Sequence, residues 1–360
     1  MATAALAFDP VRVRRGAVAR PQALAVWLFV VAALVFAMIV VGGITRLTES
    51  GLSIVRWDPV GGIVPPRTAA DWAAEYAAYR TSPQGVLVNA AMGLAAFKGI
   101  FFWEYLHRVI ARVFVTALVV PLAWFAIRRA IPAGYGPRLL VIFGLGALEP
   151  IVGWWMGASG LDKLPAVAPE RLATHLSIAF TILSVTLWTA LDMAALARAA
   201  HAPSAAQGRA AAAAVRPTVW IVPFFALLAV QIVWGALTAG LRAGHAADTW
   251  PLMLGQWVPP LQSVIADAVS VQFVHRTLAY AVAFAALAVA FVTFRAGAGR
   301  RSAVLASLIV LQFTLGVLTI IHGVPIPLAA AHQACAAMLL AATVWTAHWA
   351  VADGRAVVRQ

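Results

Sequence analysis

Charged residues are scarce in this sequence, and cysteine is almost absent. Only 11% of the 360 residues are charged, whereas 63% are hydrophobic. A soluble domain needs more charge at its surface, so this composition excludes a soluble globular protein. The single cysteine, Cys335, excludes an intramolecular disulfide. We expect Cys335 to be a buried, unreactive thiol inside an apolar helix.

Acidic residues are the scarcer charge, with 13 against 26 lysines and arginines, which gives a net charge of +13. This excess does not indicate nucleic-acid binding, because most of the cations gather between alternate apolar segments. They lie near residues 12–20, 128–138, 198–216, 295–301 and 355–359. By the positive-inside rule we predict that both termini are cytoplasmic. The expected surroundings are a lipid bilayer, with no nucleic-acid partner.

Long apolar runs are abundant, and the mean hydropathy is +0.89. About 20 apolar residues are enough to cross a bilayer as a helix. We predict spans at 24–44, 97–127, 139–157, 172–197, 217–240, 267–294, 302–321 and 328–351. Each segment in lipid must satisfy its own backbone hydrogen bonds. The predicted fold class is therefore an all-α integral membrane protein with eight transmembrane helices and no sheet.

The sequence repeats itself, and histidines mark the repeat. The run from Phe102 to Arg108, which contains His107, returns as Val271 to Arg276 with His275. The surroundings of His175 return around His332, and Gly42–Thr45 returns as Gly235–Thr238. A unit of four helices that occurs twice predicts two pseudo-symmetric four-helix bundles.

The predicted organisation follows from this repeat. Residues 1–23 form a cytoplasmic leader, because the first apolar run is too long for a signal peptide. The N-terminal bundle is 24–197, with an outer loop at 45–96 that we expect to contain short helices. An alanine-rich linker at 198–216 joins it to the C-terminal bundle, 217–351, and 352–360 form a cytoplasmic tail.

The four repeated histidines are candidate metal ligands. His107, His175, His275 and His332 lie early in alternate spans, so all four fall toward the outer leaflet. A single membrane histidine is as well explained by packing or by a proton path. Two pairs at equivalent places favour ligation, and two imidazoles without thiolates fit heme iron better than zinc or copper. We predict one bis-histidine heme site in each half.

Arginines near these histidines are candidate partners of heme propionates. Arg108 and Arg276 directly follow His107 and His275, and Arg46 and Arg242 lie at the outer ends of the first and fifth spans. A guanidinium forms charge-assisted hydrogen bonds with carboxylates. The alternative is that these arginines only extend to the membrane interface.

One acid distinguishes the halves. Glu104 lies three residues before His107, on the same helical face, and its repeat counterpart is Gln272. A carboxylate at one site alone predicts chemistry in the first half, with Glu104 as the catalytic acid or base, and a structural or electron-supplying heme in the second. The alternative for Glu104 is a salt bridge to Arg108 or Lys98. For Glu149, an acid within the third span, a function and neutral drift remain equally open.

Several runs resemble the heme A synthase family, in its eight-helix form from alphaproteobacteria and mitochondria. They cover about residues 25 to 350 in order and include Gly42–Ser53, Phe97–Arg108, Thr249–Met253, Val271–Arg276 and Ala331–Ala334. The chain departs from the family pattern at Glu149-Pro150, Leu254 and Ala111, and it lacks the cysteine pair of some relatives. None of these departures affects the four histidines or Glu104.

The resemblance implies a two-step oxidation of the C8 methyl of heme O to the formyl group of heme A. It implies that His107 and His175 serve the substrate heme, that Glu104 is required, and that His275 and His332 hold a resident heme b. Expected partners are a heme O synthase and cytochrome oxidase assembly proteins, and a homo-oligomer is compatible with the sequence. The short leader favours a bacterial inner membrane over a mitochondrial one.

Two other functions are consistent with the residues alone. The first is a diheme electron carrier between a quinol and a partner, which needs no acid at one site. The second is a repeat-built transporter that uses histidines as a proton path. Glu104 favours the enzyme over the carrier, and the parallel arrangement of the repeats disfavours the transporter.

Overall fold

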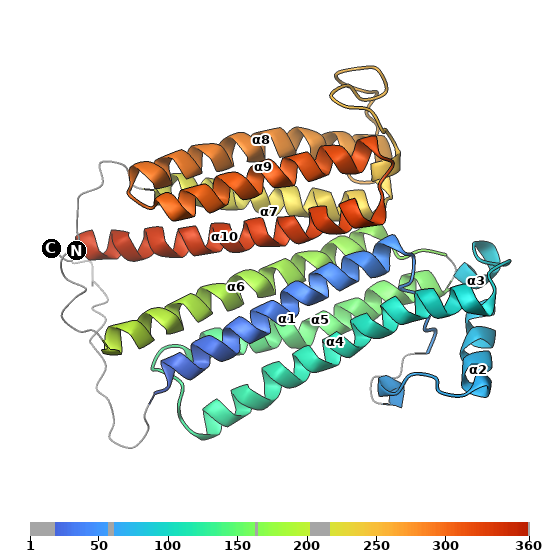
Figure 1. Ribbon diagram of the computed structural model, residues 1–360, viewed down its shortest axis with the longest axis horizontal. Coiled ribbons are helices and arrows are strands. Elements are labelled where there is room, and N and C mark those ends of the chain that lie inside the picture. Colours follow the sequence, from blue (N-terminus) through green and yellow to red (C-terminus); the bar gives the residue numbers. More distant parts are fainter. Residues whose placement is uncertain (1–18, 57–60, 163–164, 202–216, 359–360) are drawn as a thin grey trace, which may run out of the picture.

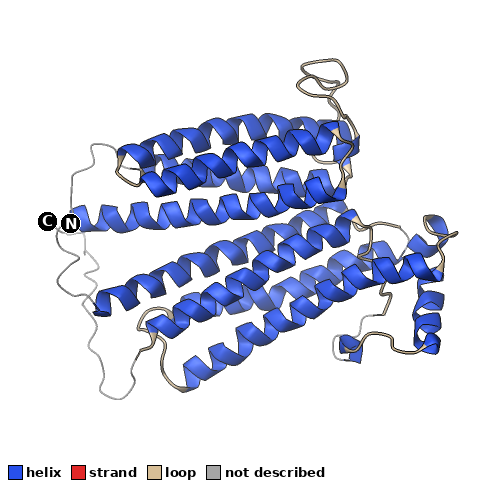
Figure 2. Cartoon of the chain, viewed as in Figure 1, coloured by secondary structure: helices blue, strands red, loops and turns tan. Residues whose placement is uncertain are grey.

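Eight long helices make up most of the chain. The computed structural model describes residues 19–56, 61–162, 165–201 and 217–358, and these ranges contain helices and loops but no strand (Figure 2). The long helices are α1 (Pro21–Leu47), α4 (Leu94–Ile127), α5 (Gly136–Asp162), α6 (Pro169–His201), α7 (Thr218–Gly240), α8 (Ala268–Arg295), α9 (Gly299–Ile321) and α10 (Ile326–Val358). All eight are long and apolar enough to cross a membrane, which confirms the eight predicted spans.

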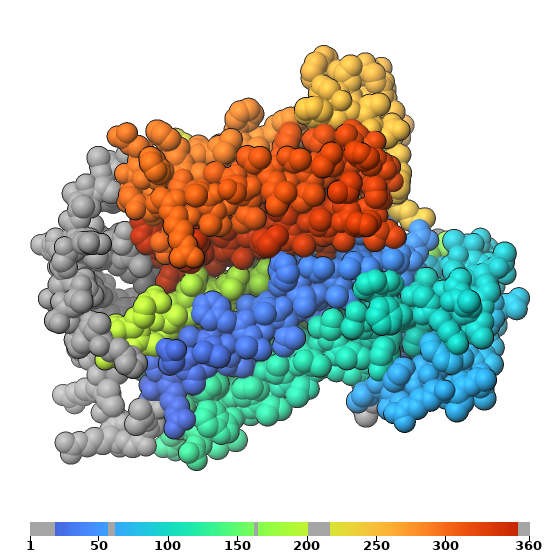
Figure 3. Space-filling model, in the orientation of Figure 1, coloured from blue at the N-terminus to red at the C-terminus, as the bar shows by residue number. Residues whose placement is uncertain are grey.

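The long helices lie in two groups of four (Figure 1). One group is α1, α4, α5 and α6, and the other is α7 to α10. The groups meet where α1 and α6 pack against α10 and where α6 packs against α7. Figure 3 shows α1 between α4 and the C-terminal group. The start of α1 and the end of α10 lie at the same end of the molecule (Figure 1); that this end is cytoplasmic stays a prediction.

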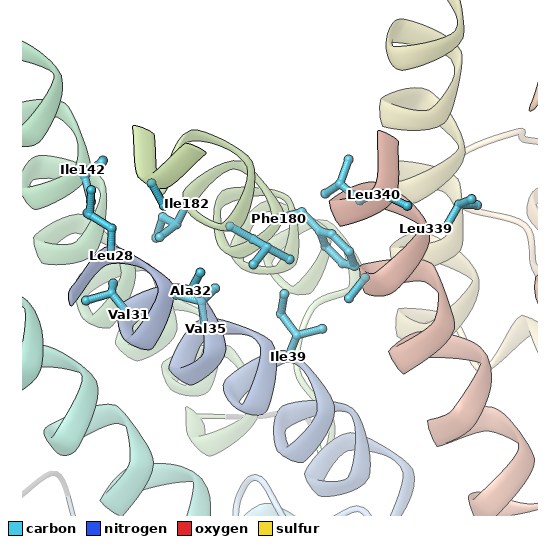
Figure 4. Close-up of a cluster of buried hydrophobic side chains, with 14 of the residues drawn as sticks. Leu28, Val31, Ala32, Val35, Ile39, Ile142, Phe180, Ile182, Leu339 and Leu340 are labelled. Atoms are coloured by element: carbon cyan, nitrogen blue, oxygen red, sulfur yellow. The ribbon is translucent and has the colours of Figure 1, made fainter. Parts of the chain in front are cut away.

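Close packing of aliphatic side chains joins the two groups. Leu28, Val35 and Ile39 of α1 belong to a buried cluster that also contains Phe180 of α6 and Leu340 of α10 (Figure 4). In lipid, helix association depends on van der Waals packing and on hydrogen bonds between helices more than on removal of apolar surface from water. The interface between the halves is therefore a packed core, which holds the helices in a fixed relation.

Short helices lie in the loop between α1 and α4, as expected. They are the 3-10 helix η1 (Gly61–Ile63), α2 (Ala69–Arg80) and α3 (Pro83–Leu87). Thr68 and Asp71 form a capping box at the start of α2. Hydrogen bonds from the backbone of Thr68 and Arg67 hold the pKa of Asp71 below its ordinary value. Buried Tyr79 of α2 packs with Phe97 of α4, so this loop is fixed to the start of α4.

In the C-terminal half, the corresponding loop lies between α7 and α8 and contains one short helix, η3 (Ala243–His245). Asp267 then caps α8 by accepting hydrogen bonds from Ser270, and these bonds lower the pKa of Asp267. Cys335 is 1% exposed, in agreement with the buried thiol predicted above. Residues 1–18 of the predicted leader and 202–216 of the predicted linker lie outside the described residues, and α10 extends to Val358, into the predicted tail.

Candidate functional site: two histidine pairs

His275 of α8 and His332 of α10 face each other across the C-terminal group. Their ring centroids are 6.5 Å apart and their planes are inclined at 84°. Two imidazoles that bind one metal ion from opposite sides have centroids about 6.4 Å apart, because each metal–nitrogen bond is about 2.0–2.1 Å long. The separation of this pair therefore fits coordination of a single metal ion between the rings.

His107 of α4 and His175 of α6 form the corresponding pair in the N-terminal group. The two imidazoles are close enough to interact electrostatically. Each pair joins the second and the fourth long helix of its group, as the sequence predicted. The structure thus brings together all four predicted histidines as two pairs, each within one half of the molecule.

The Nδ1 atoms of the four rings have similar surroundings. In each ring Nδ1 is buried and, among the described residues, has no hydrogen-bond partner, while the ring as a whole stays partly accessible. Within the same described ranges, no three His, Cys, Asp or Glu side chains come together to hold a bare metal ion. An iron porphyrin needs only two protein ligands, because the macrocycle supplies the other four. The residues present fit heme at each pair.

Glu104 lies one turn before His107, and both of its carboxylate oxygens accept hydrogen bonds. Its Oε2 accepts hydrogen bonds from the Ser53 hydroxyl at 2.7 Å and the Ile54 amide at 2.8 Å. Its Oε1 pairs with the Arg108 guanidinium, with Nη2 at 2.7 Å. The salt bridge to Arg108 considered above is therefore present, whereas Lys98 Nζ lies over the Trp72 ring. The catalytic role of Glu104 stays a prediction.

Arg108 and Arg276 bind the loops that precede α4 and α8, the helices of His107 and His275. Besides Glu104, Arg108 donates to the carbonyl of Ile54 at 2.9 Å. Arg276 donates to the carbonyls of Ala247 and Thr249, both at 2.7 Å. Each guanidinium thus joins the helix of one predicted ligand to the loop before that helix. That they bind propionates stays a prediction.

Arg46 and Arg242 lie where the two halves meet. Arg46 of α1 donates to the carbonyl of Ala239 in α7 at 2.5 Å. Arg242 forms an ion pair with Glu49 at 2.8 Å. Both arginines therefore connect the C-terminal end of α1 to the C-terminal end of α7. Their predicted role toward propionates is likewise untested, and the contact between the halves was not predicted.

Glu149 of α5 lies beside His175, which was not predicted from the sequence. Its Oε1 is 3.2 Å from His175 Nδ1, although the angles are not those of a hydrogen bond. Its repeat counterpart, Gln312, places Nε2 3.3 Å from His332 Nε2. A signal for this was present in the sequence, because both residues lie four positions before a repeated glycine, Gly153 or Gly316, and so share its helical face.

The fold and the site together define a multi-pass helical membrane protein with two pairs of partly buried histidines. The chain belongs to the cytochrome oxidase assembly protein family COX15-CtaA, whose family model matches residues 25–344.

Among its curated relatives, the heme A synthase of Rhizorhabdus wittichii is 49% identical over 339 residues, which are 91% of this chain and 94% of the relative. The heme A synthase of Sphingopyxis alaskensis is 44% identical over 91% of this chain and 92% of its own length. That of Rhodospirillum centenum is 42% identical over 95% of this chain and 92% of its own length.

Proposed function

We propose that this protein is a heme A synthase, which oxidises the C8 methyl group of heme O in two steps to the formyl group of heme A. The observation that carries the proposal is the pair of facing imidazoles at 6.5 Å, in a chain whose relatives bear that name. The diheme carrier has no comparable support, because the relatives are named as synthases.

The proposal gives the two halves different tasks. His107 and His175 would hold the substrate, heme O, and release the product, heme A. His275 and His332 would hold a resident heme b, which supplies redox chemistry when bound. Each of the four histidines lies in the first half of its helix, which supports the proposal that both hemes would lie at the same depth. Arg108 and Arg276 would orient them from the outer end.

Glu104 would act at the substrate heme. Its carboxylate is held by Ser53, Ile54 and Arg108, so its position relative to His107 is fixed. A carboxylate fixed near the reacting methyl group would accept a proton or stabilise developing positive charge. The counterpart Gln272 does neither, which supports the assignment of the chemistry to the first half.

The proposed setting follows from the same assignment. The eight apolar helices make this a multi-pass membrane protein, and we infer a bacterial inner membrane because the relatives named above come from bacteria. A heme O synthase would supply its substrate, and proteins that assemble cytochrome oxidase would receive the product. Self-association into a homo-oligomer is compatible with this arrangement.

The test is heme extraction and chromatography. Cells that make heme O but lack a heme A synthase would be compared with and without this chain. We expect heme A only in cells that express the chain, with an accompanying fall in heme O. Unchanged heme O and no heme A, despite membrane-inserted protein, would refute the proposed function.

A further inference from the structure

Each of the four histidine rings lies against a glycine of the long helix that precedes it. A Cβ atom added to these glycines would lie 2.9, 3.2, 3.1 and 3.0 Å from Cε1 of the ring. In the same order the pairs are Gly42 with His107, Gly153 with His175, Gly235 with His275, and Gly316 with His332. The contact at Gly42 is closer than real Cβ atoms come, and the other three are tighter than nine in ten real Cβ contacts. A methyl group at any of these positions would therefore require its imidazole to shift, whereas glycine permits the observed position.

The same contact determines which side of each ring faces the glycine. From the added Cβ atom, Nδ1 is the second-nearest ring atom, at 3.3 to 3.7 Å, and Nε2 is farther, at 3.8 to 3.9 Å. The edge formed by Cε1 and Nδ1 therefore rests on the bare backbone of the preceding helix. Nε2 is the nitrogen farther from the glycine in all four rings, and in His332 it also lies 3.3 Å from Gln312 Nε2 of α9. Because Nδ1 lies nearer the glycine, Nε2 is the nitrogen left to bind a ligand.

Other glycines in the described ranges have different neighbours. An added Cβ at Gly240 would meet the backbone of Pro169, and one at Gly146 would meet Leu118, as expected for close helix packing. Gly157, one turn after Gly153 on α5, would meet nothing within 4 Å. At the four glycines above, by contrast, the three nearest atoms all belong to one ligand histidine.

We propose that Gly42, Gly153, Gly235 and Gly316 are positioning residues for the heme ligands: each fixes the rotation of its imidazole and the direction of Nε2. The proposal rests on the two heme sites of the proposed function. In heme-free protein the ring is the free end of a flexible side chain and yields to an added methyl group. Once Nε2 is bound on its other side, the ring is held from two directions and cannot yield.

This difference separates a ligand-positioning role from simple packing. If a glycine only lets two helices approach, alanine should destabilise the heme-free protein as well. If it positions the ligand, alanine should leave the heme-free protein at least as stable, because alanine is the better helix former. The cost should then appear only when heme is bound.

The experiment uses purified full-length protein, stripped of heme and titrated with hemin. Gly42→Ala and Gly153→Ala are made in a His332→Ala background, so that only the N-terminal pair is intact. Gly235→Ala and Gly316→Ala are made in a His107→Ala background. The matched control is Gly157→Ala, and Gly299→Ala, whose added Cβ would make ordinary contact with Phe294, serves the C-terminal half. Melting temperature without heme, hemin affinity, low-spin EPR signals and reduction potential are measured.

We expect each of the four variants to bind hemin roughly 10–100-fold more weakly than its background, as is typical when support of a metal ligand is lost, or to shift the EPR signals and the potential. The controls should do neither. Affinity, spectra and potential equal to those of the background would overturn the proposal. So would a lower melting temperature without heme, which would assign the glycine to helix packing.

The outcome is independent of heme A formation. If the glycine variants behave as expected while no heme A is made, the positioning role stands and the proposed function fails. If heme A is made and the variants match their controls, the function stands and the positioning role fails.

Discussion

Each half binds the loop before its second long helix through one buried side chain, but the hydrogen bonds run in opposite directions in the two halves. Glu104 accepts hydrogen bonds from the Ser53 hydroxyl and the Ile54 amide, whereas Gln272 donates to the carbonyls of Gly244 and Ala247. Both side chains are buried, at 5% and 1% exposure. The anchor is thus common to both halves, and an anchor alone does not require an acid. The negative charge of Glu104 is therefore not required for anchoring the loop, and the proposed chemistry at the substrate heme would explain it.

The helix packing of the halves differs as well. In the C-terminal group α8 and α9 pack closely, whereas α4 and α5 make few close contacts. On α5, Gly144 and Gly157 would place an added Cβ in open space. The converse holds for another equivalent pair, because α1 and α6 pack closely whereas α7 and α10 make fewer close contacts. The loosely packed helix pair is thus α4 with α5 in the half that would exchange its heme, and α7 with α10 in the half that would keep one.

The largest expected effect tests whether the acid itself matters. Glu104→Gln keeps the size of the side chain and an oxygen that accepts from Ser53 and Ile54, but it removes the charge. We expect heme A formation to fall by at least about 100-fold, the usual size of a lost general acid or base, with hemin binding at His275 and His332 unchanged. The measurement is the heme A to heme O ratio in cell extracts.

Glu170→Gln is the matched control, because Glu170 lies exposed in the first turn of α6. It should leave the ratio unchanged. If Glu104→Gln also left it unchanged, Glu104 would be a loop anchor equivalent to Gln272, and the difference between the halves would lose its functional meaning.

Periodicity and the repeat predicted what depends on local sequence. The eight spans, the pairing of His107 with His175 and of His275 with His332, and the position of Glu104 beside His107 follow from hydropathy and spacing. The contact between the halves did not follow, because it joins residues far apart in sequence. Arg46 reaches Ala239 across 193 positions, and hydropathy carries no information on which helix end meets which.

A second prediction concerns a hydrogen bond at one of two equivalent helix pairs that join the halves, α1 with α10 and α6 with α7. Gln333, next to His332 on α10, donates to the carbonyl of Ile39 in α1 at 2.7 Å. Its repeat counterpart, Leu176, packs instead on the apolar cluster around Ala236. Gln333→Leu should lower the free energy of unfolding by about 1 kcal/mol, the usual net value of one hydrogen bond. Thermal unfolding of the purified protein measures it.

Gln333→Leu would give both helix pairs an apolar residue at this position. Gln256→Leu, at an exposed loop position, is the control and should have no such effect. A Gln333→Leu protein as stable as the parent would show that an apolar contact stabilises both helix pairs equally well. The difference between Gln333 and Leu176 would then have no role in stability.

The smallest expected effect concerns the ion pair at which the halves meet. Glu49 and Arg242 occupy equivalent places in the two repeats, and both have a positive φ, 55° and 52°. Their side chains are 35% and 46% exposed, so solvent screens the pair. A double-mutant cycle with Glu49→Arg and Arg242→Glu should give a coupling of about 0.2–1 kcal/mol, because exposed pairs contribute little. The exchange is well matched, because the two positions have nearly the same φ angle and each already carries a charged residue.

Salt provides the control for this coupling. At about 1 M ionic strength the screening length falls to about 3 Å, so the coupling should nearly vanish. Each single variant places like charges together, and Glu49→Arg also adds a third arginine beside Arg46, so the singles should be less stable than the exchanged pair. A coupling that persisted at high salt would mean that contact between the halves shields the pair from solvent. The two repeats would then be joined at the C-terminal ends of α1 and α7 by electrostatics as well as by the packed core.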